Sequence, residues 1–455
     1  MMRSILAYLQ QHEARNVEEL LTLLRFPTIS ADPRHEMDML ACAQYLRDWL
    51  AARGFSAELL PTGGHPAVYA EWLAAPGAPT VLSYGHYDVQ PVDPLELWNS
   101  PPFSPMIRDG CVYARGADDD KGQFLTHLLA AQAHLEVRGR LPVNLKIILE
   151  GEEEIGSVHL PETLQKNRDK LAADVAVISD SGQLAAGRPT LCYGLRGLLY
   201  FQVKVSGPSH DLHSGEYGGA VANPVNVLCG MIGRLQDADG RITIPGFYDR
   251  VRPMEAWERE LLDRLGYGPE EVRRLTGVPE LPAGGRRHPA EATWFLPSLD
   301  CNGIVGGYTG AGAKTVLPAE ASAKISMRLV PDQDPKEISA AFVAWLKELA
   351  PPSVRLELQQ LSCAGPILVP SQGRWMEAAR AALKMTFNRD PLLVRMGGSI
   401  PIVLDIAETL GLESLLLGWG LPDDCLHAPN EKFDLAQFHA GTRAMAQLYD
   451  QLATA

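Results

Sequence analysis

The sequence has few cysteines, and none of them belongs to a paired motif. Its 455 residues include seven cysteines, an odd number, scattered along the chain without a Cys-x-x-Cys pair. This pattern argues against a structural zinc site and against a disulfide framework. Unpaired thiols are typical of proteins in a reducing compartment, so we predict a cytoplasmic location.

Long hydrophobic runs are also absent. No stretch approaches the ~18 consecutive apolar residues that a membrane-spanning helix requires. Residues 1–12 contain a short apolar patch but no small-residue cleavage site, which favours an amphipathic helix over a signal peptide. We therefore expect no membrane partner.

Positive charge is the third scarce property. The chain has 41 Lys and Arg residues against 55 Asp and Glu residues, a formal net charge of −14. Because phosphate binding requires a basic surface, this balance argues against nucleic acid as a partner. The composition, 46% hydrophobic and 21% charged, is that of a globular protein, and the length suggests roughly two to four domains.

Short, continuous apolar runs predict an α/β catalytic domain. Such runs are typical of strands buried on both faces, and they occur at 80–84, 145–149, 175–178, 392–394 and 415–417. Helical patterns lie between them, for example at 124–137 and 376–385. We therefore predict a mostly parallel sheet covered by helices.

The middle of the chain has a different pattern. Residues 200–205 and 323–330 alternate between apolar and polar side chains, which is typical of strands with one exposed face. We predict that residues 198–365 form a smaller α+β domain. It would be inserted into a catalytic domain built from residues 1–197 and 366–455.

Groups that can bind a cation or move a proton follow most of the predicted buried strands. They include His86 and Asp88, the acidic run 150–154, Asp180, and a loop with His427. Ligands of open α/β sheets bind at the carboxyl ends of strands, so these side chains should form one acidic pocket. Each has a simpler explanation by itself: a structural histidine, a solvated loop or, for 118–120, a helix N-terminus. Their recurrence at strand ends favours a site.

This set of side chains is suited to a pair of divalent cations. Two histidines and three carboxylates are ligands that zinc and manganese accept. A shared carboxylate lets two cations sit roughly 3.5–4 Å apart, where they polarise a scissile carbonyl and activate a water. The reaction also needs a carboxylate as general base. The adjacent Glu153 and Glu154 can supply one ligand and one base.

At these residues the sequence resembles the M20 family of metallopeptidases, in particular its dipeptidase branch with the carnosinase-like cytosolic nonspecific dipeptidases. The matching stretches follow the family's order over nearly the whole chain. They are GHYDVQP (85–91), ARGADDDKGQ (114–123), EGEEEIGS (150–157), CYGLRGLLYFQVKVSGPSHDLHSGEYGG (192–219), GAKTVLP (312–318), SMRLVP (326–331), GGSIP (397–401) and LHAPNEKF (426–433). The resemblance implies a homodimer in which the inserted domain serves as lid and dimerisation domain.

The resemblance also implies a role for each residue of the catalytic domain's site. Two divalent metal ions, zinc or manganese, would be held by His86, Asp119, Glu154, Asp180 and His427. Asp119 would bridge both metals, with a cis peptide bond to Asp120, and Asp88 would orient His86. Glu153 would be the general base.

Further roles fall in or next to the inserted domain. His213 matches a histidine that reaches the developing oxyanion across a dimer interface. Thr315 matches a residue that the neighbouring subunit likewise contributes. Arg328 and the Gly398-Ser399 turn match the site for the substrate's terminal carboxylate, which an arginine and backbone N–H groups suit chemically.

The sequence departs from the family pattern at several positions. Met396 stands where the dipeptidase branch usually has glutamate, which puts the substrate range in doubt. Ile155 replaces a common serine, and Ala428-Pro429 differs from the usual pair. Asp180, where the family's carboxypeptidases and deacylases tend to have glutamate, favours a dipeptidase. We predict a hydrolase that cleaves amide bonds of dipeptides or short peptides through a metal-activated water.

Other functions would account for parts of the sequence. A deacylase of N-acyl or N-carbamoyl amino acids, or a carboxypeptidase, would use the same two-metal chemistry. A nucleotide-binding loop at 307–315 lacks a lysine directly after its second glycine. A non-catalytic scaffold is disfavoured because all five ligands and the base are present.

Overall fold

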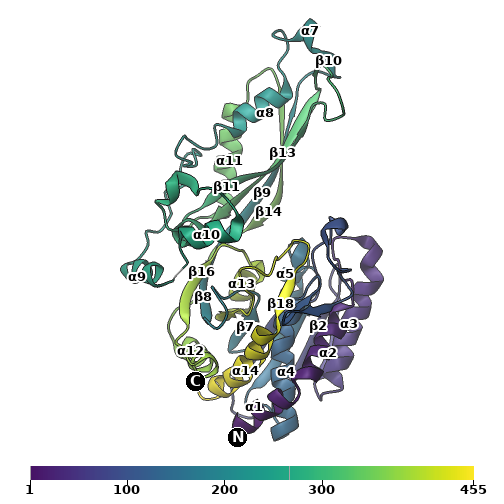
Figure 1. Ribbon diagram of the computed structural model, residues 1–455, viewed down its shortest axis with the longest axis vertical. Coiled ribbons are helices and arrows are strands. Elements are labelled where there is room, and N and C mark those ends of the chain that lie inside the picture. The colour runs from purple at the N-terminus through teal and green to yellow at the C-terminus, as the bar shows by residue number, and fades with distance from the viewer. Residues whose placement is uncertain (1, 266) are drawn as a thin grey trace. The chain divides into compact units, whose positions relative to one another are not determined.

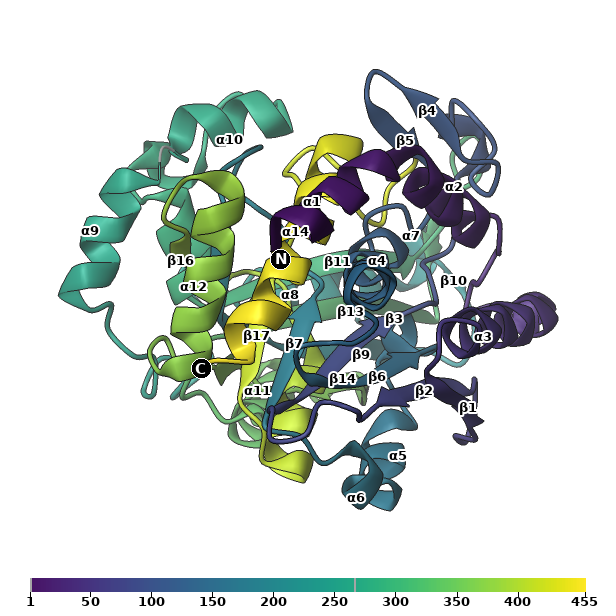
Figure 2. The same ribbon diagram turned by 90° about the horizontal axis from the view of Figure 1, so that it is seen from below.

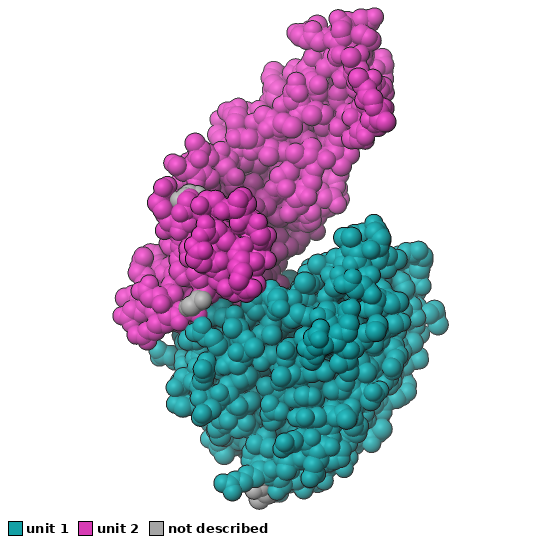
Figure 3. All heavy atoms as spheres, viewed as in Figure 1, with its two compact units in different colours: residues 1–193, 369–394, 400–455 teal, residues 194–368, 395–399 magenta. Residues whose placement is uncertain are grey.

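The computed structural model describes residues 2–265 and 267–455, and the chain divides into two compact units (Figure 3). Unit 1 comprises residues 1–193, 369–394 and 400–455, and unit 2 comprises residues 194–368 and 395–399. Unit 2 is therefore an insertion in unit 1. It also includes the short segment 395–399, which the sequence pattern had not separated from the catalytic domain.

Within the described residues, unit 1 contains most of a nine-stranded mixed sheet, of which residues 194–195, 367–368 and 395–396 belong to unit 2 (Figure 1). The strand order is β1 (Ser56–Leu60), β2 (Ala67–Trp72), β6 (Asn144–Glu150), β3 (Thr80–His86), β7 (Val175–Ser179), β17 (Ser414–Leu417), β8 (Thr190–Leu195) and β15 (Ile367–Leu368), with β16 (Leu392–Met396) also paired to β8. The neighbours β6, β3, β7 and β17 pair in parallel, and the other described pairings are antiparallel. The predicted α/β class is confirmed, and its parallel part is the centre of the sheet.

Helices cover both faces of this sheet. Figure 2 shows α1 (Met2–Gln11), α4 (Lys121–Arg138) and α14 (Leu435–Leu452) on one side, with α5 (Leu160–Lys166) and α6 (Arg168–Leu171) on the other. The remaining α-helices of the unit are α2 (Glu13–Leu24), α3 (Glu36–Ala51), α12 (Arg374–Phe387) and α13 (Pro401–Asp405). Helix α4 is buried from Lys121 to His134, because it packs against β3 on one side and α14 on the other.

A small antiparallel sheet lies beside the large one in unit 1. Its strands are β4 (Met106–Arg108), β5 (Cys111–Tyr113) and β18 (Lys432–Asp434), with β5 in the centre. Strand β18 follows the loop that carries His427, and β5 leads directly into residues 114–119. Because β18 pairs with β5, the His427 loop and residues 114–119 are held next to each other although they are far apart in the sequence.

Unit 2 contains an antiparallel four-stranded sheet in the order β11 (Ser298–Gly306), β13 (Glu320–Leu329), β9 (Gly197–Ser206) and β14 (Arg355–Ala364). Buried and half-buried residues alternate along β9, as the sequence pattern predicted. Helices α8 (Pro224–Ile232) and α11 (Pro335–Leu349) pack on this sheet. Helices α9 (Ala256–Arg264) and α10 (Pro269–Thr276) lie between α8 and β11 in the sequence.

Short elements complete unit 2. Strands β10 (Leu212–His213) and β12 (Val316–Leu317) pair with each other, and α7 (Ser214–Tyr217) follows β10. The segment 307–315 leads into β12 rather than into a helix, so it lacks the helix of a nucleotide-binding loop. None of the helices formed by residues 2–265 and 267–455 is long and apolar enough to cross a bilayer.

Candidate metal centre

The five ligands expected from the sequence come together in unit 1. His86 is the last residue of β3, Asp180 follows β7, and Asp119 lies just before α4. Glu154 lies in a 3-10 turn after β6, and His427 lies in the loop between β17 and β18. In the described chain they form two groups whose ligand atoms lie within 4.8 Å of one another: His86, Asp119 and Asp180, and Asp119, Glu154 and His427.

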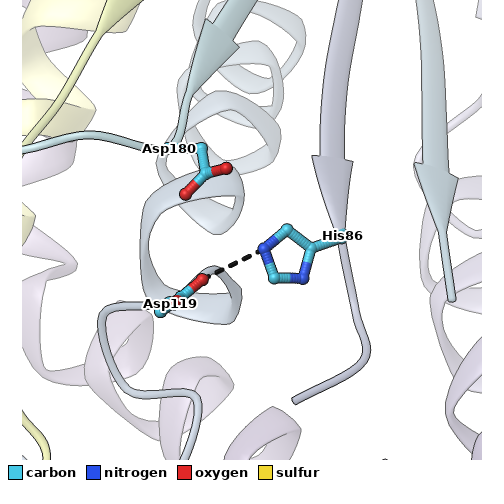
Figure 4. A group of neighbouring side chains, drawn as sticks. All are labelled: His86, Asp119 and Asp180. Carbon is cyan, nitrogen blue, oxygen red and sulfur yellow. Dashed lines mark ion pairs between the residues drawn. The ribbon is translucent and has the colours of Figure 1, made fainter. Parts of the chain in front are cut away.

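Asp119 belongs to both groups. Its Oδ1 lies 3.1 Å from Nε2 of His86, and its Oδ2 lies 2.9 Å from Nε2 of His427. The same His427 nitrogen is 3.5 Å from Oε2 of Glu154. Figure 4 shows His86 and Asp119 facing each other, with Asp180 beside them. The two oxygens of Asp119 thus face two different histidines, which is what a carboxylate shared by two cations requires.

Asp88 holds two parts of the site at once. Nδ1 of His86 lies 3.1 Å from the Asp88 carbonyl oxygen and 3.4 Å from Oδ1, so Nε2 is left to face Asp119. The backbone N–H groups of Glu153 and Glu154 donate to the Asp88 carboxylate at 3.2 and 3.0 Å. The buried carboxylate therefore aligns the turn after β6 as well as His86, a contact that the sequence did not suggest.

The aspartates on either side of Asp119 do not act as helix caps. Asp120 occupies the position before α4, but its side chain accepts the backbone N–H of His86 at 3.1 Å instead of capping the helix. The Asp119–Asp120 peptide bond is cis, as the resemblance led us to expect. Asp118 is buried, and neither of its carboxylate oxygens has a hydrogen-bond partner in the described chain. Both residues lie at the start of α4, where the helix-terminus explanation places them, but their side chains do not cap the helix by hydrogen bonds.

Three polar residues at the site had been assigned no role from the sequence. Nε2 of Gln90 donates to Oε2 of Glu154 at 2.7 Å, and Glu431 and Arg115 form a buried ion pair behind Asp119. Their presence in the motifs 85–91, 114–123 and 426–433 was the only signal. A motif marks such residues as unusual without showing what they contact.

Burial and negative charge dominate the electrostatics of the site. Burial, together with the nearby charge of Asp119, raises the pKa of Asp180 to about 7 and raises that of Glu154. Burial also raises the pKa of Asp119, but His427 and His86 outweigh it, and the pKa is lowered overall. For His86 burial lowers the pKa, and the carboxylates of Asp119 and Asp88 reverse the shift. The crowded carboxylates therefore need positive charge.

The donor set fits divalent cations. Nε2 of His86 and Oε1 of Glu154 are buried and have no hydrogen-bond partner among the described residues, so both are available to coordinate a cation. Imidazole nitrogen and carboxylate oxygen are ligands for zinc and manganese. Cations would also compensate the negative charge that raises the carboxylate pKa values.

The remaining predicted residues lie in unit 2. His213 and Thr315 are both exposed and are neighbours, because the N–H of Ser214 donates to the carbonyl of Thr315 at 3.0 Å. Nη1 of Arg328 donates to Oγ of Ser399 at 3.0 Å. Arg196 holds the same turn: its Nε donates to the carbonyl of Gly397 at 2.9 Å, and its backbone N–H to that of Gly398 at 3.1 Å.

Comparison with known proteins identifies the family. A model of peptidase family M20/M25/M40 matches residues 82–451. The chain belongs to this family. The Cys-Gly metallodipeptidase DUG1 of Candida albicans is 33% identical, with 96% of this chain and 94% of the relative covered. The predicted resemblance to the dipeptidase branch is confirmed, and the protein is a metal-dependent peptidase.

Solved structures of the family share this fold. Human carnosine dipeptidase 1 is similar at a TM-score of 0.90 and 29% identity, with 100% of this chain and 99% of the other covered. An M20 family metallo-carboxypeptidase of Sulfolobus solfataricus, Sso-CP2, is similar at a TM-score of 0.87 and 33% identity, with 97% and 99% covered.

Proposed function

We propose that this metallopeptidase hydrolyses dipeptides and other short peptides that carry a free C-terminal carboxylate. The observation that carries the proposal is the position of Asp119, whose two oxygens face two separate groups of ligands. Support for the substrate class comes from the relatives, which are named as a Cys-Gly metallodipeptidase and a carnosine dipeptidase.

Two divalent cations, zinc or manganese, would occupy the site. His86 and Asp180 would hold one cation, Glu154 and His427 the other, and Asp119 would contact both. When bound, such a pair polarises the scissile carbonyl and lowers the pKa of a water molecule.

Glu153 is the proposed general base. It lies beside Glu154 but outside both ligand groups, and its carboxylate makes no hydrogen bond to the described residues. Burial, reinforced by the charges of Asp180 and Asp119, raises its pKa well above the ordinary value. A carboxylate of this kind can accept a proton from the attacking water and deliver it to the leaving amine.

His213 is suited to donate a hydrogen bond to the developing oxyanion. Its Nδ1 accepts the backbone N–H of Gly215 at 3.0 Å, which assigns the ring proton to Nε2. The exposed imidazole can therefore donate a hydrogen bond through Nε2. We propose, from the family resemblance, that His213 and Thr315 serve the active site of a partner subunit.

The proposed dimer is a homodimer formed through unit 2. Strand β11 is at the edge of the unit 2 sheet and pairs with β13 on one side. Its residues Ile304 and Val305 are 49% and 74% exposed. An open edge with exposed apolar side chains is a surface on which a second chain can pair.

The substrate's C-terminal carboxylate would bind to unit 2 at Arg328, with the Gly398-Ser399 turn beside it. The hydrogen bond between Arg328 and Ser399 already brings a guanidinium group to this turn. A guanidinium with adjacent backbone N–H groups is a suitable site for a carboxylate.

The seven cysteines, all free thiols, are compatible with the cytoplasmic location that we propose for the enzyme.

A carboxypeptidase is the second candidate, because the Sulfolobus relative with that name is 33% identical to this chain. Dipeptidases and carboxypeptidases both bind a terminal carboxylate, so substrate length separates them. The purified protein, loaded with zinc or manganese, should be tested on dipeptides, dipeptide amides, longer peptides and N-acetyl amino acids. We expect the dipeptides to have the highest kcat/KM. A preference for longer peptides would establish the carboxypeptidase, and a preference for N-acetyl amino acids would establish a deacylase.

A further inference from the structure

A single buried carboxylate, that of Glu431, holds the loop that carries Asp119. Its Oε1 accepts the backbone N–H groups of Asp118 and Asp119 at 3.1 and 3.2 Å. Its Oε2 accepts the N–H of Gly116 at 2.9 Å and Nη1 of Arg115 at 2.7 Å. All four hydrogen bonds go to residues 115–119, so the carboxylate is fully used on one loop.

The same residue ties this loop to the segment that carries His427. Glu431 follows His427 by four residues and comes directly before β18, which pairs with β5. Its own carbonyl accepts the N–H of Ala114 at 3.1 Å. Both the backbone and the side chain of Glu431 thus connect the two loops from which Asp119 and His427 face each other.

Arg115 balances the charge of Glu431 and adds a third segment. The guanidinium is 1% exposed, and its Nη2 donates to the carbonyl of Pro91 at 3.0 Å. It also lies over the ring of Trp98, 5.4 Å from the centroid. The ion pair is therefore enclosed by the segments 91–98, 115–119 and 427–431. Because both charges are paired and hydrogen-bonded, their burial is tolerated.

The position of Asp119 must be controlled closely if it is to serve two cations. Its oxygens are 3.1 and 2.9 Å from two histidine nitrogens that belong to different groups, so a small rotation of its backbone would move one oxygen away. Metal sites require their ligands within about 0.5 Å of the working position. Glu431 accepts a hydrogen bond from the Asp119 backbone but belongs to neither group of candidate ligands.

We propose that Glu431 is a positioning residue of the metal centre: it fixes the Asp119 backbone so that one carboxylate reaches both cations, and it thereby sets the affinity for the pair. This inference rests on the proposed two-metal function. The alternative is that the Glu431–Arg115 pair contributes only to the stability of the fold.

The test is the cation affinity of Glu431→Gln, measured without any substrate. Glutamine keeps the size of the side chain, but an NH2 group replaces one of the two carboxylate oxygens. This NH2 group cannot accept the hydrogen bonds that the oxygen accepts in the wild-type protein. We expect zinc affinity, measured by competition with a chelator on the metal-free protein, to fall by about 10- to 100-fold. The loss of kcat should exceed any change in KM, because Glu431 is fully buried and its carboxylate is occupied by residues 115–119.

A matched control is available in Glu258→Gln. Glu258 and Arg395 form another buried Glu–Arg pair, 2.5 Å apart and 1% and 4% exposed, in unit 2. Both variants should lower the melting temperature of the metal-free protein, but only Glu431→Gln should weaken zinc binding. Wild-type zinc affinity in Glu431→Gln, or an equal loss in the control, would show that the pair is merely structural.

A second variant covers the case in which Glu431→Gln does not fold. The double variant Arg115→Met/Glu431→Gln removes both charges and leaves no unpaired buried guanidinium. It should fold and show the same loss of zinc affinity, and wild-type affinity in this variant would overturn the proposal. If the wild-type protein itself binds fewer than two cations, the two-metal function fails, and this outcome is distinct from an unaffected Glu431 variant.

Discussion

Replacing Glu153 by glutamine separates proton transfer from metal binding. Glutamine keeps the volume of the side chain and leaves the backbone N–H bond to Asp88 in place. It removes the only group that we assign to proton transfer, and general bases typically contribute 10²–10⁴-fold. We therefore expect kcat to fall by at least about 100-fold, equivalent to about 2.7 kcal/mol of barrier.

Metal content and KM should change little in this variant. Glu153 lies outside both ligand groups, and removing its charge relieves repulsion with Asp180 and Asp119. Steady-state kinetics on a dipeptide and elemental analysis of the same preparation would check both expectations. A residual kcat above about one tenth of the wild-type value would refute the role of Glu153, because a base cannot contribute so little.

Glu152 provides the control from the same acidic run. Its buried carboxylate accepts the N–H of His65 at 3.2 Å and lies 2.8 Å from Nδ1 of His159, so it is occupied by structural partners. Glu152→Gln should therefore alter stability more than kcat. Equal losses of kcat in Glu152→Gln and Glu153→Gln would show that the acidic run matters only as a whole.

Three further predictions concern other parts of the chain. His213→Ala should lower kcat by about 100-fold or more. If His213 acts across a dimer, mixing this variant with Glu153→Gln should restore some activity. No restoration despite subunit exchange would contradict the shared site. Arg328→Met should lower kcat/KM for dipeptides but not for dipeptide amides, and equal losses for both substrates would remove Arg328 from carboxylate binding. Burial lowers the pKa of His127 to about 3, so below pH 6.5 the unfolded chain gains a proton there that the folded chain does not. Folding stability of the metal-free protein, measured by denaturant unfolding, should therefore fall by about 1 kcal/mol from this group between pH 6.5 and 5.5, and His127→Gln should show a correspondingly smaller fall.

The convergence of the candidate ligands could be predicted from sequence because the features behind it are local. His86 and Asp180 come two residues after the continuous apolar runs 80–84 and 175–178, which lie in the central parallel strands β3 and β7. Neighbouring parallel strands end at the same edge of a sheet, so the residues that follow them converge without further information. The alternation along β9 is likewise visible in the sequence, because the side-chain period of a strand is two.

Only the tertiary structure decided which residues hold these ligands in place. Glu431 and Asp119 are 312 positions apart, and no local pattern indicates that one accepts the N–H of the other. The same holds for the antiparallel edges of the large sheet. It also holds for segment 395–399, which belongs to unit 2 and in which Gly397 contacts Arg196 and Ser399 contacts Arg328. Local side-chain periodicity indicates whether a residue is buried. Its hydrogen-bond partner, in contrast, depends on which distant segments the fold brings together.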